Sequence, residues 1–412
     1  VNTSTRGLVI NEGTLEIGNN EAFGIATAAI TINGGIIRAA GAARQIANPI
    51  VVNNDFTLGR LTDLNGGLTL TKDVTITANN FDGAANNPSI LSAISGDFRL
   101  TLAQGPQGIG TGALVMAGQN TNSGGTTVAS GRVNVTGALA NAKLAVNGGE
   151  LNLNNPSQTI TGLSGTGGRI NLDFSHTLTV AQDDTSTFAG VFGGGGSLVK
   201  GGVGELTLSG LSPEFFGPTR VLGGTLTVAG SINGEVTVSG ANSVLRGTGS
   251  TGFVNVTAGG TLTPGDVVPG FFTTNGLTME SGAKLNLEIN SSFVGSGYDQ
   301  LNVLGEVDLG GSTLNLLGSF LMSLNEHGSL FYVLLNDGID PITGTFNGIA
   351  EGGFVQSSSG QNFQLTYLAD FETNAFSGGN DIALMAIPEP GAALSLLTGV
   401  GMLLGMRRRR KA

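Results

Sequence analysis

The chain has 412 residues, of which 70 are glycine, and it contains no cysteine, no tryptophan and two histidines. Without cysteine there is no disulfide framework and no thiol nucleophile, and two histidines cannot form a three-histidine zinc site. The net charge of −11 disfavours a nucleic-acid partner, because an acidic surface repels phosphates. Apolar residues make up 40% of the chain, which argues against disorder. Short apolar segments alternate with glycine-rich turns, and this pattern predicts an all-β protein.

Short apolar–polar–apolar triplets recur throughout residues 1–270, separated by glycine-rich pairs. Typical triplets are Leu206–Leu208 and Leu226–Val228, each with a threonine in the middle. Alternation with a period of two places the apolar residues on one face of a β-strand. The outer residues of these triplets should therefore face the core, while Thr207 and Thr227 should face outward.

Longer units repeat in the same region. Residues 5–18, 125–137 and 218–230 share a similar order, in which a short strand such as Thr-x-Val and a glycine turn precede a second strand such as Leu-x-Val and a further glycine. Such self-similarity predicts a parallel β-solenoid, in which each coil buries its apolar residues against its neighbours. With about 20 residues per coil, residues 1–270 would form roughly 13 coils and a rod about 60 Å long. The irregular spacing of the repeats leaves a set of glycine-rich β-sandwiches as the alternative.

The composition changes after residue 270. Of the 23 aromatic residues, 13 lie in residues 271–385, among them Phe331 and Phe363. Larger apolar side chains indicate a thicker core, so we expect residues 271–386 to form a C-terminal β module. Such a module would cap the solenoid, whose last coil otherwise exposes an apolar face and unpaired backbone groups.

The last segment, residues 387–412, differs from everything before it. A Pro-Glu-Pro motif is followed by 16 residues without a charge, 391–406, and then by a basic cluster. The motif consists of Pro388, Glu389 and Pro390, and the cluster contains Arg407, Arg408, Arg409 and Arg410. As a helix the apolar run would span about 24 Å, slightly less than the hydrocarbon core of a bilayer. We therefore predict a single C-terminal hydrophobic helix in the membrane, with the arginines on the cytoplasmic side.

This three-part order resembles the PEP-CTERM sorting signal of Gram-negative bacteria. The resemblance implies a protein that is secreted, held transiently in the inner membrane by its tail and delivered to the cell surface or extracellular matrix. It also implies an exosortase-type sorting protease in the membrane as a partner. Residues 1–4 lack the basic and apolar regions of a signal peptide, and the chain opens inside a repeat. We therefore expect the natural N-terminus to lie upstream.

The segment Ser197–Gly210, together with its relatives in residues 1–265, resembles the autotransporter-associated β-strand repeat of bacterial passenger domains. This resemblance implies a right-handed parallel β-helix at the cell surface. Together the two resemblances imply an association with exopolysaccharide.

Few residues suggest catalysis. His176 and His327 are expected in loops or on the surface. Asp183 and Asp184 are adjacent, and neighbouring residues on a strand point to opposite faces, so a solvated turn is expected rather than a catalytic pair.

Two glycine-rich motifs resemble ligand-binding loops only weakly. Gly193–Gly196 followed by Lys200 lacks the Gly-Lys-Ser/Thr ending of a phosphate loop. Gly378–Asp381 is a single poor match to a calcium-binding repeat, which normally occurs in tandem. The sequence therefore predicts no catalytic residue, no cofactor and no metal site.

The function that fits these features is that of a structural or adhesin-like surface protein rather than an enzyme. One alternative is a polysaccharide-acting β-helix enzyme, but residues 1–270 lack tryptophan, tyrosine and a dense acid–base cluster. The other is a passive spacer that carries a functional domain upstream of residue 1.

Overall fold

The computed structural model describes residues 2–79, 89–105, 113–321, 328–338 and 340–387. These residues contain β-strands and turns but no helix, which confirms the all-β prediction. Parallel strands wind into right-handed β-solenoid turns, so the solenoid prediction is confirmed and the β-sandwich alternative is not. The chain divides into two compact units, residues 1–237 and 238–412, which are treated separately below.

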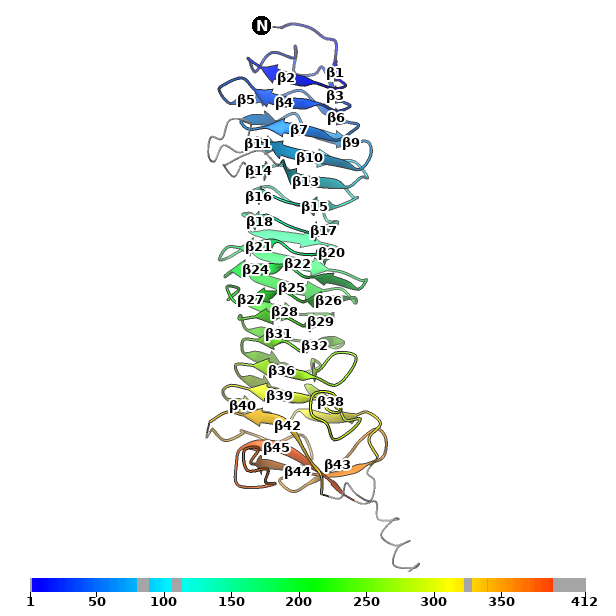
Figure 1. The fold of residues 1–412 in the computed structure, drawn as a ribbon, viewed down its shortest axis with the longest axis vertical. Coiled ribbons are helices and arrows are strands. Elements are labelled where there is room, and N and C mark those ends of the chain that lie inside the picture. Colours follow the sequence, from blue (N-terminus) through cyan, green and yellow to red (C-terminus); the bar gives the residue numbers. More distant parts are fainter. Residues whose placement is uncertain (1, 80–88, 106–112, 322–327, 339, 388–412) are drawn as a thin grey trace, which may run out of the picture. The chain divides into compact units, whose positions relative to one another are not determined.

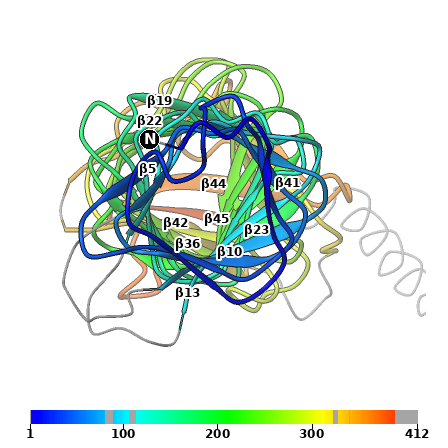
Figure 2. The same cartoon turned by 90° about the horizontal axis from the view of Figure 1, so that it is seen from above.

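In the first unit, parallel strands stack in rungs and form three faces around a narrow core (Figures 1 and 2). One face begins with the strands β1 (Leu8–Ile10), β3 (Ile30–Ile32), β6 (Ile50–Val52), β9 (Leu68–Leu70) and β12 (Ile94–Ser95). Further along the chain, a second parallel sheet contains β19 (Ser157–Ile160), β22 (Thr177–Ala181), β25 (Ser197–Gly201) and β28 (Thr219–Val221).

The second face consists of β2 (Thr14–Ile17), β4 (Ile36–Ala39), β7 (Phe56–Gly59), β10 (Val74–Asn79), β13 (Leu100–Gln104), β15 (Thr126–Val128), β17 (Lys143–Val146) and β20 (Gly162–Ser164). It continues through a bridge between Gly165 and Phe188 into β23 (Ser186–Phe188), β26 (Glu205–Leu208) and β29 (Gly224–Val228).

The third face consists of β5 (Arg44–Ile46), β8 (Thr62–Leu64), β11 (Ser89–Leu91), β14 (Ala113–Met116), β16 (Arg132–Val135), β18 (Glu150–Leu153), β21 (Arg169–Leu172) and β24 (Val191–Gly194). It continues into β27 (Leu211–Ser212) and β30 (Ser231–Ile232) through a bridge between Gly194 and Phe215. The short strand β31 (Val236–Val238) lies where the two units divide.

Neighbouring rungs pack well because like residues of the apolar–polar–apolar triplets lie opposite each other in the ladder. Leu206 pairs with Leu226 and Thr207 with Thr227 in the ladder between β26 and β29. Leu206, Leu208, Leu226 and Val228 are all buried, as the triplet pattern predicts. Thr207 points outward and is half-buried. Thr227 is covered, because its hydroxyl donates a hydrogen bond of 2.6 Å to Glu205 Oε1.

In the first unit, the buried amide side chains of Asn120 and Gln158 form hydrogen bonds with backbone groups of neighbouring rungs. Asn120 accepts from the Ile94 amide (3.0 Å) and donates to the Ala138 carbonyl (2.7 Å). Gln158 similarly accepts from the Leu139 amide at 2.8 Å. These side chains satisfy the backbone amides of Ile94 and Leu139, which lie between strands.

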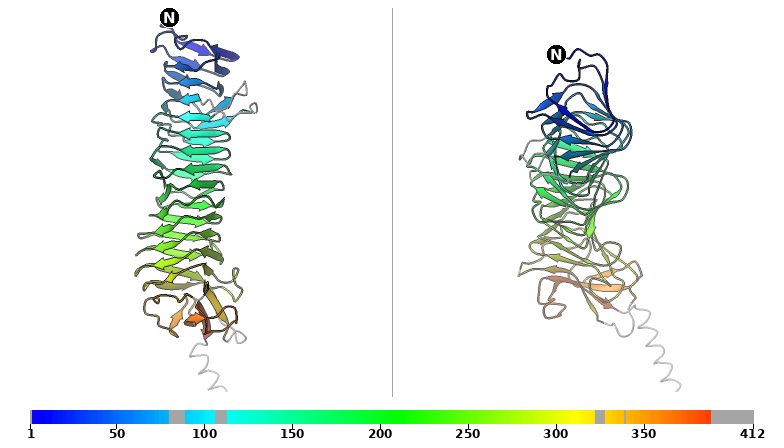
Figure 3. Two further views of the ribbon diagram at one scale, coloured as in Figure 1. Left: turned by 90° about the vertical axis from the view of Figure 1, so that its left-hand side faces the viewer. Right: turned by 45° about the horizontal axis from the view of Figure 1, so that its top comes forward.

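The second unit also begins with parallel rungs on three faces (Figure 3). The faces are formed by β34 (Val254–Val256), β37 (Leu277–Met279) and β40 (Val307–Asp308); by β32 (Ser243–Gly247), β35 (Thr261–Pro264), β38 (Lys284–Glu288) and β41 (Thr313–Leu317); and by β33 (Ser250–Thr251), β36 (Phe271–Thr274), β39 (Gln300–Val303) and β42 (Leu330–Asn336).

Parallel pairing therefore continues past residue 270 and changes at β42. This strand pairs antiparallel with β45 (Asp381–Ile387), which pairs with β44 (Asn362–Ala369), which in turn pairs with β43 (Phe354–Gln356). The core here is aromatic: the ring of Phe331 lies 5.1–5.6 Å from those of Tyr298, Phe320 and Phe363. The predicted boundaries at 270 and 386, and the capping role, stay predictions.

Candidate functional site

The residues assigned to sorting, Pro388–Pro390 and Arg407–Arg410, lie outside the described residues, as does His327. Among the described residues, no helix has the length and apolar character needed to cross a bilayer. In that same part of the chain, no three histidine or acidic side chains are grouped so as to hold a metal ion. Polar side chains from distant sequence positions nevertheless meet on the surface of the first unit.

The tetraglycine segment and Lys200 do not form a phosphate loop. Gly193 and Gly194 belong to strand β24, whereas Lys200 belongs to β25 and is fully buried. The Lys200 ammonium donates hydrogen bonds to the carbonyl oxygens of Gly201 (2.6 Å), Gly202 (3.3 Å) and Gly223 (3.1 Å). Burial lowers the pKa of Lys200, although the nearby Asp183 carboxylate opposes the shift. All three donors of the ammonium are satisfied, so Lys200 links two neighbouring rungs and has no donor left for a phosphate.

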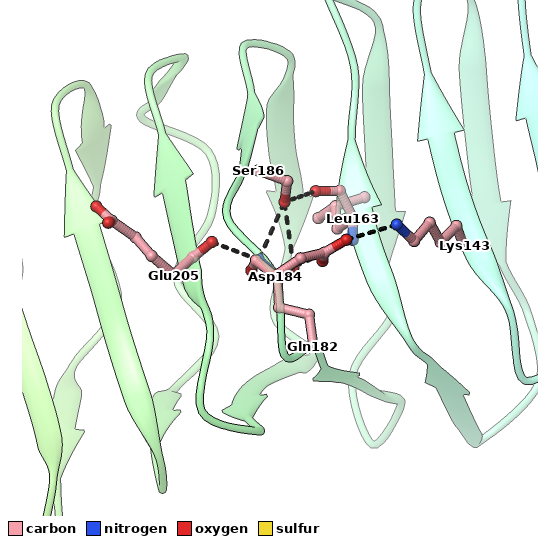
Figure 4. A network of polar contacts seen from close by, with 6 residues as sticks. All are labelled: Lys143, Leu163, Gln182, Asp184, Ser186 and Glu205. Carbon is pink, nitrogen blue, oxygen red and sulfur yellow. Dashed lines mark hydrogen bonds and ion pairs between the residues drawn. The ribbon is translucent and has the colours of Figure 1, made fainter.

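The adjacent acids Asp183 and Asp184 lie in a bend, as predicted, and have separate partners. Asp183 Oδ1 accepts a hydrogen bond from the Val203 amide at 3.2 Å. Asp184 Oδ2 pairs with the Lys143 ammonium at 2.5 Å (Figure 4). This hydrogen bond, with the charge of Lys143, lowers the pKa of Asp184. The two carboxylates therefore share neither a proton nor a substrate position.

Beside this ion pair, the buried Gln182 links three rungs (Figure 4). Its amide nitrogen donates to Ser186 Oγ (3.0 Å) and to the backbone carbonyl of Glu205. Ser186 Oγ donates in turn to the Leu163 carbonyl at 2.6 Å. The network fixes the bend that presents Asp184 to Lys143.

A polar ladder runs along the third face. Asn152 donates to Asn134 Oδ1 at 2.9 Å, and Asn171 donates to both Asn152 Oδ1 (2.7 Å) and Glu150 Oε1 (2.6 Å). Glu150 Oε2 accepts from Arg132 Nε at 3.0 Å. Because these groups satisfy one another across neighbouring rungs, the ladder stabilises the stack and offers few free donors or acceptors.

The second face carries a polar trough of about 590 Å³. Its floor is a column of outward side chains in register: Thr101 pairs with Thr127, Thr127 with Ala145, and Ala145 with Ser164. The column crosses strands β13, β15, β17 and β20, so the floor is made of hydroxyl and methyl groups at the rung spacing of about 4.8 Å.

Two cationic side chains, Arg99 and Lys143, line the same trough. The residue at the corresponding position of the rung between them is Gly125, since Leu100 pairs with Thr126 and Thr126 with Leu144. Gly125 has a φ of 86°, a conformation that favours glycine, and a methyl group there would collide with the backbone carbonyl of Lys143. The rung between the two cations therefore approaches its neighbour closely and carries no side chain of its own at this position. Both cations are exposed.

Sequence reasoning did not identify this trough. Arg99 and Lys143 are far apart in the chain, and neither belongs to a recognisable motif. The available signal was the alignment of Arg-Leu-Thr-Leu at 99–102 with Lys-Leu-Ala-Val at 143–146. Once these two strands are placed two rungs apart on one face, the cations must lie near each other.

The two remaining candidate residues, His176 and Asp381, lie in a turn and in a buried hydrogen-bond network. His176 lies in the turn between β21 and β22 and is half-buried. Asp381, the last residue of the calcium-like motif, is buried, and its carboxylate accepts from the amides of Asn336 and Phe371, both at 2.9 Å. Burial raises the pKa of Asp381 against these two bonds. Both oxygens are therefore already used by the backbone.

Comparison with known proteins relates this solenoid to bacterial surface proteins. Residues 109–135 and 198–228 match the passenger-associated-transport-repeat family. Over 204 residues, 47% of this chain, the sequence is 31% identical to the adhesin BmaC autotransporter of Brucella suis biovar 1 (strain 1330). Over 271 residues, 63% of the chain, it is 28% identical to outer membrane protein A of Rickettsia rickettsii. The matches cover only 6% and 11% of these two relatives.

Proposed function

We propose that this chain is a non-enzymatic, adhesin-like segment of a bacterial cell-surface protein. The observation that supports the proposal most directly is the match of residues 109–135 and 198–228 to the passenger repeat. The described residues of both segments form stacked rungs of the solenoid, in strands β14 to β16 and β25 to β29. The names of the two relatives, an adhesin and an outer membrane protein, support the same proposal.

The solenoid suits this role physically. Each rung contacts only its neighbours, so repetition lengthens the structure without enlarging the core. The outward positions carry threonine, asparagine and serine, which present hydroxyl and amide groups along each face. A surface of this kind can be presented at a distance from the cell and can bind polar partners at several rungs.

The tail forms the second part of the proposal. Pro388, Glu389 and Pro390 would be recognised by an exosortase-type sorting protease after the apolar run has entered the inner membrane. Arg407–Arg410 would resist translocation and keep the end of the chain on the cytoplasmic side. The mature protein would then be released to the cell surface or matrix, where it would associate with exopolysaccharide.

Surface accessibility tests the first part. Intact cells that express the gene should lose the solenoid to an added protease, whereas a cytoplasmic marker should remain. Cells lacking the gene should adhere less to a glycan-coated surface, and re-expression should restore adhesion. A solenoid that stays protected until the cells are lysed would contradict the proposal.

The mass of the C-terminus tests the second part. In a host with the sorting protease, the surface protein should lack the residues after Pro390, whereas a host without the protease should retain Ala412. Deletion of Arg407–Arg410 should release unprocessed protein. An intact C-terminus in both hosts would contradict sorting without affecting the adhesin proposal.

A further inference from the structure

We propose that the trough on the second face binds an acidic oligosaccharide, with Arg99 and Lys143 holding two of its carboxylate groups. This inference goes one step beyond the surface role proposed above and rests on it for the biological setting. The binding site itself is a property of the first unit.

The two cations sit at a defined separation. Arg99 immediately precedes β13 and Lys143 begins β17, two rungs away, with Gly125 at the corresponding position of the rung between them. Two rung spacings place the backbones of Arg99 and Lys143 about 10 Å apart. A ligand that reaches both must therefore be extended and must carry more than one negative charge.

Arg99 is available for such a ligand. Within the described part of the chain its guanidinium makes no hydrogen bond or ion pair, while its backbone amide donates to Asp73 Oδ1 at 2.8 Å. A guanidinium recognises a carboxylate through two parallel hydrogen bonds, so Arg99 supplies the directional contact.

Lys143 can exchange its partner. Its ion pair with Asp184 is solvent-exposed on both sides, with 69% of the lysine side chain and 53% of the aspartate side chain accessible. Such exposed pairs contribute little, and the flexible ammonium can contact a second carboxylate. The Gln182 network keeps Asp184 in place, and strand β17 fixes the backbone of Lys143. The ammonium therefore stays within reach of both Asp184 and the trough.

The remaining lining selects a polyhydroxylated chain. Thr101, Thr127, Thr161 and Ser164 offer hydroxyl groups, and Asn141 and Asn147 offer amides. None of the described lining residues is aromatic, so the trough has no platform on which a nucleobase could stack. It also lacks the large apolar side chains that hold peptide anchors. Hydroxyl and amide groups that can both donate and accept suit sugar hydroxyls.

The charge of the lining contrasts with that of the whole protein. The chain carries −11, yet the described lining residues include two cations and no acid. The nearby acids do not line the trough and have partners of their own: Asp97 accepts a hydrogen bond from Ser123 Oγ at 2.9 Å, and Asp184 forms the ion pair with Lys143. Because the trough is open to water, salt should weaken the attraction between its cations and an anionic ligand.

Calorimetric titration of the full chain with trigalacturonate tests the proposal, with maltotriose as the neutral probe. Trigalacturonate should bind, and raising the salt from low to about 0.5 M should weaken it markedly. Arg99→Ala and Lys143→Ala should each weaken binding about tenfold or more. Arg220→Ala is the matched control, because it removes an exposed arginine from another face and should leave the affinity unchanged.

Three results would overturn the inference. These are equal binding of maltotriose, equal binding of inorganic sulfate alone, and equal loss of affinity in Arg220→Ala. Circular dichroism and the unfolding midpoint identify any variant that has lost its fold, and Arg99→Lys then provides a milder substitution that keeps the charge. If the Arg99→Ala, Lys143→Ala double variant loses glycan binding while cells still display it and adhere, the trough inference holds and another face mediates adhesion. If trigalacturonate binds but the protein never reaches the surface, the proposed function fails alone.

Discussion

The two units use the same rung architecture but fill it differently. In the first unit the core is mainly aliphatic. The rings of Phe188 and Phe192 lie 5.2 Å apart within one coil, and the ring of Phe215 in the next coil lies 5.5 Å from that of Phe192. In the second unit, where β42 turns to antiparallel pairing, Phe331 is surrounded by three further rings. Repetition makes a thin core of many small contacts, whereas the antiparallel strands make one thick local core.

Glycine also has different uses in the two regions. Gly210 and Gly230 lie at successive corners of the first unit, where a methyl group would collide with the backbone oxygen of the preceding rung. Gly338, Gly348 and Gly360 in the second unit have positive φ and open space around their α-carbons. Stacked rungs therefore require glycine for close approach, and the irregular loops require it for turn conformation.

A charge in the aliphatic core should produce the largest effect. Leu226→Asp places a carboxylate at a position with no exposed surface, and we expect a loss of more than about 4 kcal/mol in the free energy of unfolding. Thr207→Asp is the control, because this side chain points outward in the adjacent rung. Urea denaturation followed by circular dichroism measures both. Similar losses for the two variants would mean that the assigned register is wrong.

The aromatic core should be nearly as sensitive to a cavity. Phe331→Ala removes a fully buried ring that contacts three others, and we expect a loss of about 3–5 kcal/mol. Phe354→Ala removes a ring that is 66% exposed and should change stability by less than about 0.5 kcal/mol. Near-ultraviolet circular dichroism and thermal unfolding would report the difference. A small effect at Phe331 would show that this core is loosely packed.

These contrasts show what the sequence could predict. The period of two identified the strands and the inward residues Leu206 and Leu226, because alternation alone decides which face a side chain occupies. It also placed Thr207 outward. It did not reveal that Glu205 covers Thr227, since that contact depends on the register between β26 and β29.

The trough and the antiparallel strands needed information that periodicity does not contain. Arg99 and Lys143 meet only after two strands are assigned to one face and two rungs apart. The pairing of β42 with β45 joins residues about 50 positions apart across irregular loops, so no local repeat signals it. The interpretation of the tail depends on composition and order rather than on contacts, and it stays a prediction.

A buried acid should give the second unit a distinct pH dependence. Asp299 is 1% exposed, and its two oxygens accept from the amides of Gly270 (2.9 Å) and Glu288 (2.8 Å). Burial outweighs these bonds and raises the pKa of Asp299 from 3.8 to about 7. The folded state therefore holds its proton more tightly than the unfolded state. Stability should fall between about pH 4 and pH 7, by roughly 2–4 kcal/mol, and then level off.

Asp299→Asn isolates this contribution, because the amide cannot titrate. The difference in unfolding free energy between the natural chain and Asp299→Asn should change across this pH range and stay constant above it. Urea titrations at pH 4, 5, 6, 7 and 8 measure that difference. In the first unit burial also raises the pKa of Asp63, so Asp63→Asn should show the same sign with a smaller amplitude. A difference that is flat from pH 4 to pH 8 would contradict the burial of Asp299.

The smallest effect concerns the corner glycines of the first unit. Gly210→Ala inserts a methyl group against the Gly190 carbonyl oxygen, and backbone cannot yield as a flexible side chain can. We expect a loss of about 1–3 kcal/mol, because the rung must shift to relieve the overlap. Gly18→Ala is the matched control: its α-carbon faces open space, and its φ is not positive. Reduced entropy of the unfolded chain should leave Gly18→Ala neutral or slightly stabilised. If urea midpoints moved equally for both variants, close stacking would not explain the glycine at this corner.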